Sequence, residues 1–418
     1  MNGWLEHLPS GWDTIQPRSR FRERREPSRP DDEHLTPSQH LGVLTQREYM
    51  ERTGSRVVLN LSGADKMKHV EPGDFIAHLR SFQGGLETSA LRGKVSTAYT
   101  VMRAIDGAHH PYFRWVFKSH AFIGELASTT QQLRDGQTVR FQDIGSLRLP
   151  LPPEPDQRRI ADFLDDRVSR IDRIIAARNT QRGQVAAQAG QLIDHQLTDH
   201  GDRWGAVRLG RLLTKLEQGW SPAADQQPAE LGQWGVMRAG CVNSGEFRAE
   251  DNKRLPDAVE PRLEYEIKGG DLIMSRASGS LDLIGSVALV PDSVRDQLLL
   301  CDKLYRLRTV AGLVPQYTAH ALRHHANRQR IRQGVSGAEG MANNLPSGVI
   351  RSLMIPLPDR STQIEAIDRW EDEMAGNRRT QAALTRSIEL LTEYKQSLIT
   401  AAVTGQLDVT TASTRIPE

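Results

Sequence analysis

The chain has 418 residues, of which 25% are charged and 38% hydrophobic, a composition that is ordinary for a globular protein and leaves room for two or more domains. The formal net charge is only +2, so a nucleic-acid partner has to be argued from local basic patches and not from the total. We expect a cytoplasmic protein. The first residues do not resemble a secretory signal, and no apolar run is long enough to span a membrane. Cys241 and Cys301 are expected to be isolated, buried thiols, which fits a reducing compartment.

The first part of the chain is expected to form a globular unit with basic loops. Residues 18–30 carry six arginines, and Gly73-Asp74-Phe75-Ile76 begins a strand-like segment. The Gly- and Ser-rich loop at 79–94 lets the backbone approach another surface closely, and arginine and glutamine side chains can contact guanine and adenine edges. Ordinary hairpin loops are the alternative. The side chains of this unit that we expect to contact nucleic acid are Arg80, Gln83, Arg92, Lys94, Arg114 and Lys118.

A proline-rich junction follows the first unit. Pro150-Leu151-Pro152 must be extended, because proline fixes its own φ and excludes the preceding residue from the helical region. A helix can start only after it, and Pro155 stands where a first-turn proline is tolerated. The junction therefore separates a globular unit sharply from a helix.

The segment after the junction has the spacing of a coiled-coil helix, and so does a segment near the end of the chain. Apolar residues recur every seven positions, notably Leu164 and Ile171 in the first helix and Leu391 and Leu398 in the second. Both seams turn polar near the middle, and these polar stretches meet if the helices run antiparallel. The alternative is that each helix packs separately on its own domain.

The second part of the chain repeats the organisation of the first. Pro356-Leu357-Pro358 lies 206 positions after the first Pro-Leu-Pro, with Gln363 at the same offset as Gln157, and Gly270-Asp271-Leu272-Ile273 matches the earlier Gly-Asp segment. The basic side chains of this unit that we expect to contact nucleic acid are Arg276, Arg323, Arg328 and Arg330.

Motifs for catalysis or metal binding are absent from the sequence. It has no dinucleotide or phosphate-binding glycine loop, no nucleophile elbow and no H-E-x-x-H or C-x-x-C site. His109-His110 and His324-His325 are the best metal candidates. However, a doublet points its rings in different directions, and no carboxylate is spaced to complete either site. We therefore predict no catalytic residue and no metal site.

At these motifs the sequence resembles the specificity (S) subunit of type I restriction-modification systems. The resemblance rests on the junction "LPLPPEPDQRRIADFLD", on "SLITAAVTGQLD" at residues 397–408 and on "LRSFQGGLETSALRGKVSTAYTV" at residues 79–101. It covers nearly the whole chain. The second junction departs from the first, with Asp359-Arg360 where the first has Pro153-Glu154-Pro155, so it is expected to pack less rigidly.

The resemblance implies an α+β fold: two mixed α/β target-recognition domains separated by two long antiparallel coiled-coil helices, duplicated with pseudo-two-fold symmetry. We place the first recognition domain at residues 1–153, its helix at 154–200, the second recognition domain at 201–358, its helix at 359–404 and a C-terminal tail at 405–418.

The resemblance also implies the function. Each domain would bind one half of a split target in double-stranded DNA, and the helices, with Leu164, Ile171, Leu391 and Leu398, would set the spacing and dock two methyltransferase subunits. A restriction subunit would join through these. The chain itself would be non-catalytic and free of cofactors, with S-adenosylmethionine, ATP and Mg²⁺ bound by its partners. The alternatives are a coiled-coil scaffold that binds only protein and a fused restriction-modification enzyme.

Overall fold

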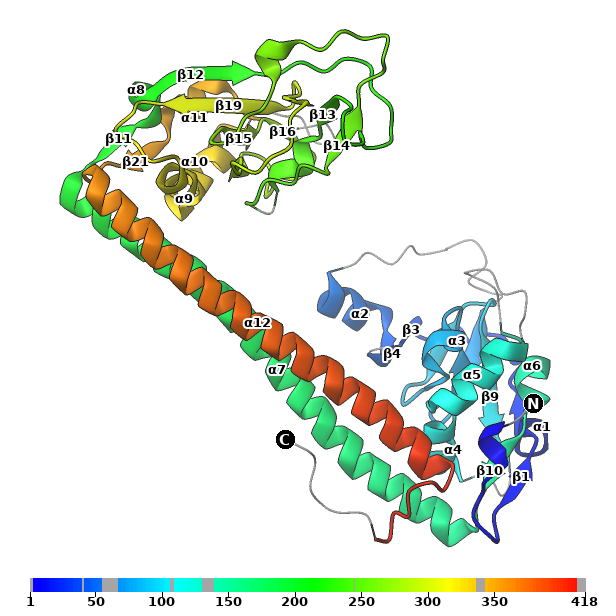
Figure 1. Cartoon of the computed structure of the whole chain (residues 1–418). Coiled ribbons are helices and arrows are strands. Elements are labelled where there is room, and N and C mark those ends of the chain that lie inside the picture. The colour runs from blue at the N-terminus through cyan, green and yellow to red at the C-terminus, as the bar shows by residue number, and fades with distance from the viewer. Residues whose placement is uncertain are drawn as a thin grey trace. The chain divides into compact units, whose positions relative to one another are not determined.

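The structure is a computed structural model that describes residues 3–39, 41–54, 67–105, 109–129, 139–243, 245–335 and 343–411 (Figure 1). The chain divides into two compact units, Met1–Thr180 with Leu384–Glu418, and Gln181–Ala383. Two long helices, α7 (Glu154–Trp204) and α12 (Arg360–Val403), contribute to both units and pack against each other. Each unit combines this helix pair with a β-rich domain, so the predicted α+β class is confirmed.

The first unit is built on a four-stranded antiparallel sheet in the order β2-β9-β6-β7. Smaller antiparallel pairs, β1-β10, β3-β4 and β5-β8, extend it. The elements of its β-rich domain are η1 (Gly3–Leu5), β1 (Asp13–Ile15), α1 (Pro17–Arg20), β2 (Phe21–Glu23), β3 (Leu35–Ser38), β4 (Gly42–Thr45), α2 (Gln46–Thr53), β5 (Lys68–Val70), β6 (Phe75–Ala77), α3 (Ser81–Gly84), β7 (Glu87–Thr88), β8 (Gly93–Val95), β9 (Thr100–Ala104), α4 (His110–Val116), α5 (His120–Thr129), α6 (Phe141–Gly145) and β10 (Leu149–Leu151).

An aromatic cluster joins this sheet to α4. Phe21 of β2 and Phe75 of β6 make edge-to-face contacts, with ring centroids 5.6 Å apart. Phe113 and Phe117, from α4 and its C-cap, pack edge-on against Phe21 at 5.2 and 5.4 Å. All four rings are fully buried, and this geometry adds to the stabilisation from burial of their area. The cluster fixes α4 and the loops on either side of it on the sheet.

The second unit has an equivalent four-stranded antiparallel sheet in the order β12-β19-β15-β17, and beside it a mixed sheet, β14-β13-β18. The elements of its β-rich domain are β11 (Ala206–Arg208), α8 (Leu209–Leu212), β12 (Leu213–Gln218), β13 (Gly235–Met237), η3 (Ala239–Val242), β14 (Asn252–Arg254), η4 (Leu263–Tyr265), β15 (Leu272–Ser275), β16 (Ala277–Ser278), β17 (Val287–Leu289), β18 (Leu298–Leu299), β19 (Leu304–Thr309), α9 (Pro315–Arg323), α10 (His325–Gly334), β20 (Asn343–Asn344), α11 (Ser347–Ser352) and β21 (Met354–Pro356).

The two units share their strand order and their proline strands. In each main sheet, an early strand pairs with the last strand, which pairs with the strand that follows the Gly-Asp motif. The Pro-Leu-Pro strand of the first unit, β10, pairs with β1, so that Asp13 faces Leu151. Likewise β21 pairs with β11, so that Ala206 faces Pro356. The repeat seen in the sequence is therefore a repeat of topology.

The shared Gly-Asp motif starts the strand next to the last one and binds a buried arginine. Gly73 and Gly270 have φ values of +92° and +83°, which glycine adopts at little cost. Asp74 then accepts two hydrogen bonds from the guanidinium of Arg24, at 2.6 and 3.0 Å, and these bonds raise the pKa of Arg24. Asp271 accepts one from Arg306 at 3.2 Å. Each aspartate also accepts from the backbone N–H three residues before it, which closes the turn.

The glutamine of each junction hydrogen-bonds back to the proline strand. The side-chain amide of Gln157 donates to the carbonyl of Pro152 at 2.8 Å, and that of Gln363 donates to the carbonyl of Pro358 at 3.0 Å. Both glutamines are buried. The bond ties the first turn of the helix to the end of the extended segment, so the same strand-to-helix turn is fixed twice.

The long helices run antiparallel where they meet. In the second unit, Asn377 donates to the carbonyl of Val185 and Trp370 donates to the side chain of Gln196, so numbers rise on one helix as they fall on the other. In the first unit, the start of α7 packs with the end of α12 in one apolar cluster. The side chain of Asn377 also accepts a hydrogen bond from Gln381 at 2.6 Å. Two hydrogen-bonded polar side chains therefore lie where the two helices pack against each other.

Two simpler expectations concern the cysteines and the membrane. Cys241 and Cys301 are free and buried, as predicted, and burial raises the pKa of the Cys301 thiol to about 11. Within the described ranges, no helix has both the length and the apolar composition that crossing a bilayer requires.

The two junction glutamines give a matched stability test. Gln363→Ala should destabilise the second unit by about 1–3 kcal/mol, because it leaves the N–H of Val314 and the carbonyl of Pro358 without their partner. Gln157→Ala removes one hydrogen bond and should cost less. Native-state hydrogen exchange of the Val314 amide and urea unfolding of both variants would measure this. An equal or larger loss for Gln157→Ala would contradict the assignment.

Candidate nucleic-acid interface

Arg80 is the N-cap of the short helix α3, and Gln83 lies within that helix. The carbonyl of Phe117 leaves no room for a Cβ at Gly85, where φ is +75°, so α3 sits directly on the end of α4. The backbone N–H of Arg80 donates to the ring of the buried His78 at 3.3 Å. Both Arg80 and Gln83 are exposed, and within the described part of the chain neither side chain has a hydrogen-bond partner. They are free to contact a ligand.

Arg92 and Lys94 flank Gly93 in β8. A Cβ at Gly93 would collide with the carbonyl of Glu33, so β8 lies tightly against the segment that leads into β3. Arg92 donates to Asp31 at 2.8 Å and lies 3.5 Å from a carboxylate oxygen of Asp32. The ammonium of Lys94 has no hydrogen-bond partner among the described residues.

The acidic residues next to Arg92 belong to a buried chain of ionisable groups that the sequence did not reveal. Asp32 and Glu71 each place a carboxylate oxygen 2.7 Å from a ring nitrogen of the fully buried His69. The bond to His69 lowers the pKa of Glu71. Because His69 fixes Asp32, and Asp32 lies beside Arg92, this chain orients the arginine. No spacing rule could have found it, since Asp32 and His69 lie 37 positions apart.

The four loop residues of the first unit do not form one cluster. Lys94 binds the carbonyl of Glu33 through its backbone N–H, and Gln39 reaches the carbonyl of Gln83. Glu33 and Gln39 are six residues apart along an extended segment, which corresponds to roughly 20 Å. Arg92 and Lys94 therefore lie at one end of β3, and Gln83 lies at the other.

Arg114 and Lys118 bind carboxylates within their own unit. Arg114 pairs with Asp165 of α7 and lies over the ring of Trp115, 4.9 Å from its centroid. Lys118 pairs with the buried Glu87 and donates to the carbonyl of Gly84 at 3.1 Å. These contacts hold α4 against α7 and against the sheet.

Arg276 of the second unit lies beside two hollows. The first, of about 280 Å³, is lined by residues that include Asn243, Ser278 and Lys303, and by the buried hydroxyl of Ser275, which has no partner in the described structure. Arg276 donates to the carbonyl of Asp302 at 3.4 Å. The adjoining hollow, of about 340 Å³, adds two further basic residues that sequence reasoning missed, Arg238 and Lys253.

The arginines of α9 and α10 differ in what they bind. Arg323 donates to the carbonyls of Val287 and Gly245, and Arg328 donates to those of Ile284 and Asp282. Burial lowers the pKa of both guanidinium groups. Arg330, in contrast, is exposed and has no hydrogen-bond partner among the residues described.

The four apolar residues assigned to the helices face the protein interior. Leu164, Ile171 and Leu398 are buried in the core of the first unit, and Leu391 packs against it. A partner that docks on these helices would therefore contact their outer faces. Leu390 of α12 and Ile364, also of α12, are exposed apolar side chains there.

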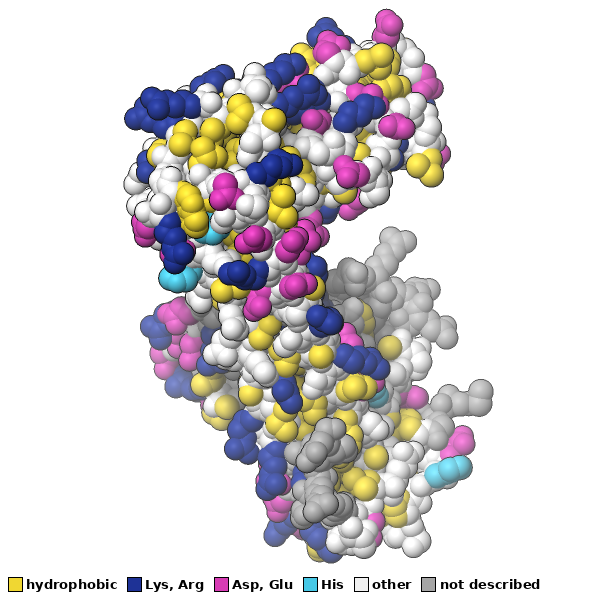
Figure 2. All heavy atoms as spheres, turned by 60° about the vertical axis from the view of Figure 1, so that its left-hand side comes forward, with side chains coloured by type: hydrophobic (Ala, Val, Ile, Leu, Met, Phe, Trp, Pro, Cys, Tyr) yellow, Lys and Arg dark blue, Asp and Glu magenta, His cyan; other side chains and the backbone are white. Residues whose placement is uncertain are grey.

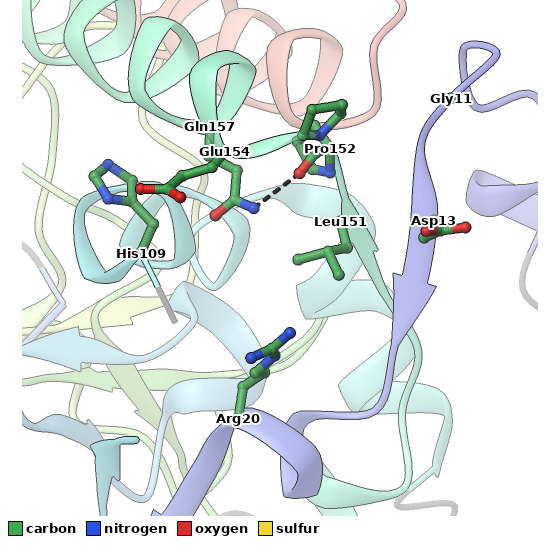
Figure 3. A pocket seen from close by; sticks show the side chains of 9 residues that line it. Gly11, Asp13, Arg20, His109, Leu151, Pro152, Glu154 and Gln157 are labelled. Carbon is green, nitrogen blue, oxygen red and sulfur yellow. Dashed lines mark hydrogen bonds between the residues drawn. The ribbon is translucent and has the colours of Figure 1, made fainter. Parts of the chain in front are cut away.

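A pocket of about 580 Å³ opens at the first proline junction (Figure 3). Glu154, Gln157 and His109 line one side of it, and Arg20 reaches in from the opposite side. The side-chain oxygen of Gln157 is buried and has no partner among the described residues, whereas the equivalent oxygen of Gln363 accepts from the N–H of Val314 at 2.9 Å. The two junctions thus differ in whether the side-chain oxygen of the glutamine accepts a hydrogen bond.

Basic and acidic side chains are interspersed on the face shown in Figure 2. No broad field of positive charge covers that face, which agrees with the net charge of +2.

The comparisons with known proteins show which proteins the chain resembles. No family model matches the chain. It is 30% identical over 171 residues to the type I restriction enzyme EcoEI specificity subunit of Escherichia coli, a match that covers 40% of this chain and 28% of that protein. It is 24% identical over 274 residues to the EcoKI specificity subunit of Escherichia coli K12, covering 62% and 58%. The chain thus spans less than two thirds of the length of these relatives.

Two solved structures share the fold. A chain from a study of complex assembly and conformational transition of the type I R-M system superimposes with a TM-score of 0.71 at 15% identity, covering 96% of this chain and 100% of that one. The HsdS subunit from Thermoanaerobacter tengcongensis gives a TM-score of 0.50 at 16% identity, covering 97% and 100%. In sequence the chain is thus similar to specificity subunits of type I restriction enzymes, and in fold it is similar to these two structures.

Two arginines from adjacent helices test the distinction between structural and exposed basic residues. Arg323→Ala should lower the free energy of unfolding by about 1–3 kcal/mol, because it leaves buried carbonyl groups without a donor. Arg330→Ala, the matched control, should change it by less than about 0.5 kcal/mol. Urea denaturation would measure both. Equal effects would show that Arg323 does not hold the loops together.

Proposed function

We propose that this chain is the DNA target-recognition subunit of a type I restriction-modification complex. Each β-rich domain would bind one half of a bipartite target, and the two helices would set the spacing between the halves. The chain would act in the cytoplasm and would have no catalytic activity of its own. Two methyltransferase subunits, and a restriction subunit through them, would supply the chemistry together with S-adenosylmethionine, ATP and Mg²⁺.

The observation that carries this proposal is a duplicated interior with different loops. The units share the sheet order, the Gly-Asp turn bound to a buried arginine, and the junction glutamine. The exposed loops differ: the first unit presents Arg80 and Gln83 beside a short helix, whereas the second presents hollows beside Arg276. A repeated scaffold with two different surfaces suits a protein that binds two different half-sites.

The proposed DNA contacts fall into two groups. The base-reading residues are Arg80, Gln83, Arg92 and Lys94 in the first unit, with Arg276 and Arg330 in the second. The other basic residues, Arg114, Lys118, Arg323 and Arg328, are occupied by carboxylates or carbonyl groups of the protein. They would have to leave these partners to bind a phosphate, so we propose them only as secondary contacts. Arg92 and Arg276 also bind acceptors of the protein, but the bond from Arg92 to Asp31 is exposed and the bond from Arg276 to the carbonyl of Asp302 is long, at 3.4 Å, so we keep both among the readers.

The helices are proposed to dock the methyltransferase subunits through their outer faces. Leu164, Ile171, Leu391 and Leu398 would act indirectly, by holding the helix pair together. Exposed Leu390 offers an apolar contact on the outside of α12.

Removal of a base-reading arginine should relax specificity. Arg80→Ala or Arg276→Ala should weaken binding of the complex to its target by about 1–3 kcal/mol and loosen the choice of base at one position. Methylome sequencing and competition binding would measure this, with exposed Arg351 of α11, outside the long helices, replaced by alanine as the control for loss of one charge. If neither variant alters affinity or the methylated sequence, these loops do not read DNA.

The division of labour can be tested with purified protein. The chain alone should neither methylate nor cut DNA, and addition of its methyltransferase subunit should give sequence-specific methylation. Methyl transfer by the isolated chain, verified as pure, would overturn the proposed function.

A further inference from the structure

Two consecutive histidines meet an aspartate from a distant helix in the second unit. His324 is both the C-cap of α9 and the N-cap of α10, and His325 is the first residue of α10. Asp194 lies on α7 together with Thr198, one turn further along. Suitable ligand atoms of the three side chains all lie within 4.8 Å of one another.

The backbone at the corner brings the two imidazole rings together. His324 has φ −50° and ψ 140°, an extended conformation between two helices, and the ring centroids of the pair are only 4.2 Å apart. The expectation that this doublet points its rings in different directions is therefore wrong here. That expectation considered only two neighbours in sequence. The extended backbone of His324, where α9 ends and α10 begins, sets the directions of both rings.

The distances approach those of a metal site. Nδ1 of His325 is 3.4 Å from one carboxylate oxygen of Asp194, and Nε2 of His324 is 4.0 Å from the other. Ligands bound tetrahedrally to zinc at about 2.0–2.1 Å lie roughly 3.3 Å from each other. Of the three pairs of ligand atoms, one already has this separation and a second needs to close by less than 1 Å. The third pair, between the two histidines, lies within 4.8 Å. The His325 side chain is 65% exposed, so its ring has room to adjust.

The surroundings leave Asp194 and the ring of His325 available to an ion and hydrogen-bond the ring of His324. The guanidinium of Arg323, the nearest basic group in sequence, is turned away and bound to Val287 and Gly245. The hydroxyl of Thr198 lies 3.1 Å from Nε2 of His324, and the N–H of His325 donates to Asp194 at 3.3 Å. Because the Thr198 hydroxyl donates to the carbonyl of Asp194 at 2.9 Å, it accepts from Nε2 of His324, so an ion that binds this nitrogen would replace its proton. The bond from His325 holds the carboxylate of Asp194 beside the corner.

We propose that Asp194, His324 and His325 bind a divalent transition-metal ion, of the zinc class, which links α7 to the corner between α9 and α10. Two imidazole nitrogens with one carboxylate suit zinc and its neighbours better than magnesium or calcium, which prefer oxygen ligands. Three protein ligands leave the fourth position to water. The proposal does not depend on how the protein binds DNA.

Zinc binding to the full-length chain, stripped of metal with a chelator, is the direct test. Isothermal titration with zinc chloride should show one site per chain, and cobalt(II) should give the absorption of a bound, low-symmetry ion. His324→Ala, His325→Ala and Asp194→Asn should each weaken binding by at least about tenfold, because loss of even an outer-shell partner typically has an effect of this size. Saturating zinc should raise the Tm of the native chain by a few degrees.

The control is His195→Ala, which removes an exposed histidine from the same helix. It should keep the affinity, the stoichiometry and the cobalt spectrum. Circular dichroism of each variant in chelator should match that of the native chain, and Asp194→Asn, the least disruptive change, keeps the test valid if an alanine variant unfolds. Absence of a one-to-one zinc site, or equal binding by the ligand variants and by His195→Ala, would overturn the proposal.

Discussion

The hydrogen bond from each junction glutamine to a proline carbonyl is the contact on which both units depend. The prolines force an extended strand, and their rings remove the N–H groups that a sheet or helix would use. Gln157 and Gln363, from the first turn of the following helix, donate to the carbonyl of the last proline in the segment. Because the same proline strand pairs with the first strand of its unit, the bond joins the sheet, the turn and the helix in one rigid connection. That is why the chain contains the junction twice.

Much of this architecture could be predicted from the sequence, because it depends on local rules. Pro-Leu-Pro determines an extended segment whatever surrounds it, and heptad spacing determines which face of a helix is apolar. The repeated Gly-Asp segment indicated duplication, although its partners Arg24 and Arg306 were not recognised. Asp74 and Arg24 lie 50 positions apart, and only the sheet brings them together.

The candidate site was harder to predict, because a basic side chain in a sequence carries no mark of what it binds. Arg323 and Arg330 lie in the same basic stretch, yet the first donates to carbonyl groups 36 and 78 positions away and the second faces solvent. The acidic residues beside Arg92 and the aspartate beside the histidine doublet could not be predicted for the same reason. Their partners come from other elements, so no spacing along the chain could indicate them.

We propose that the two units bind two half-sites at a distance set by the helices, and a change of helix length tests this proposal. Seven residues added to both helices, beside Gln181 and Asn377, keep the heptad seam in phase and lengthen each helix by roughly 10 Å. At about 3.4 Å per base pair, that is about three base pairs. Methylome sequencing of cells that carry the lengthened chain with its methyltransferase should show unchanged half-sites and a gap about three base pairs longer, or reduced occupancy where the added rotation prevents binding. The original gap at full occupancy would contradict the account.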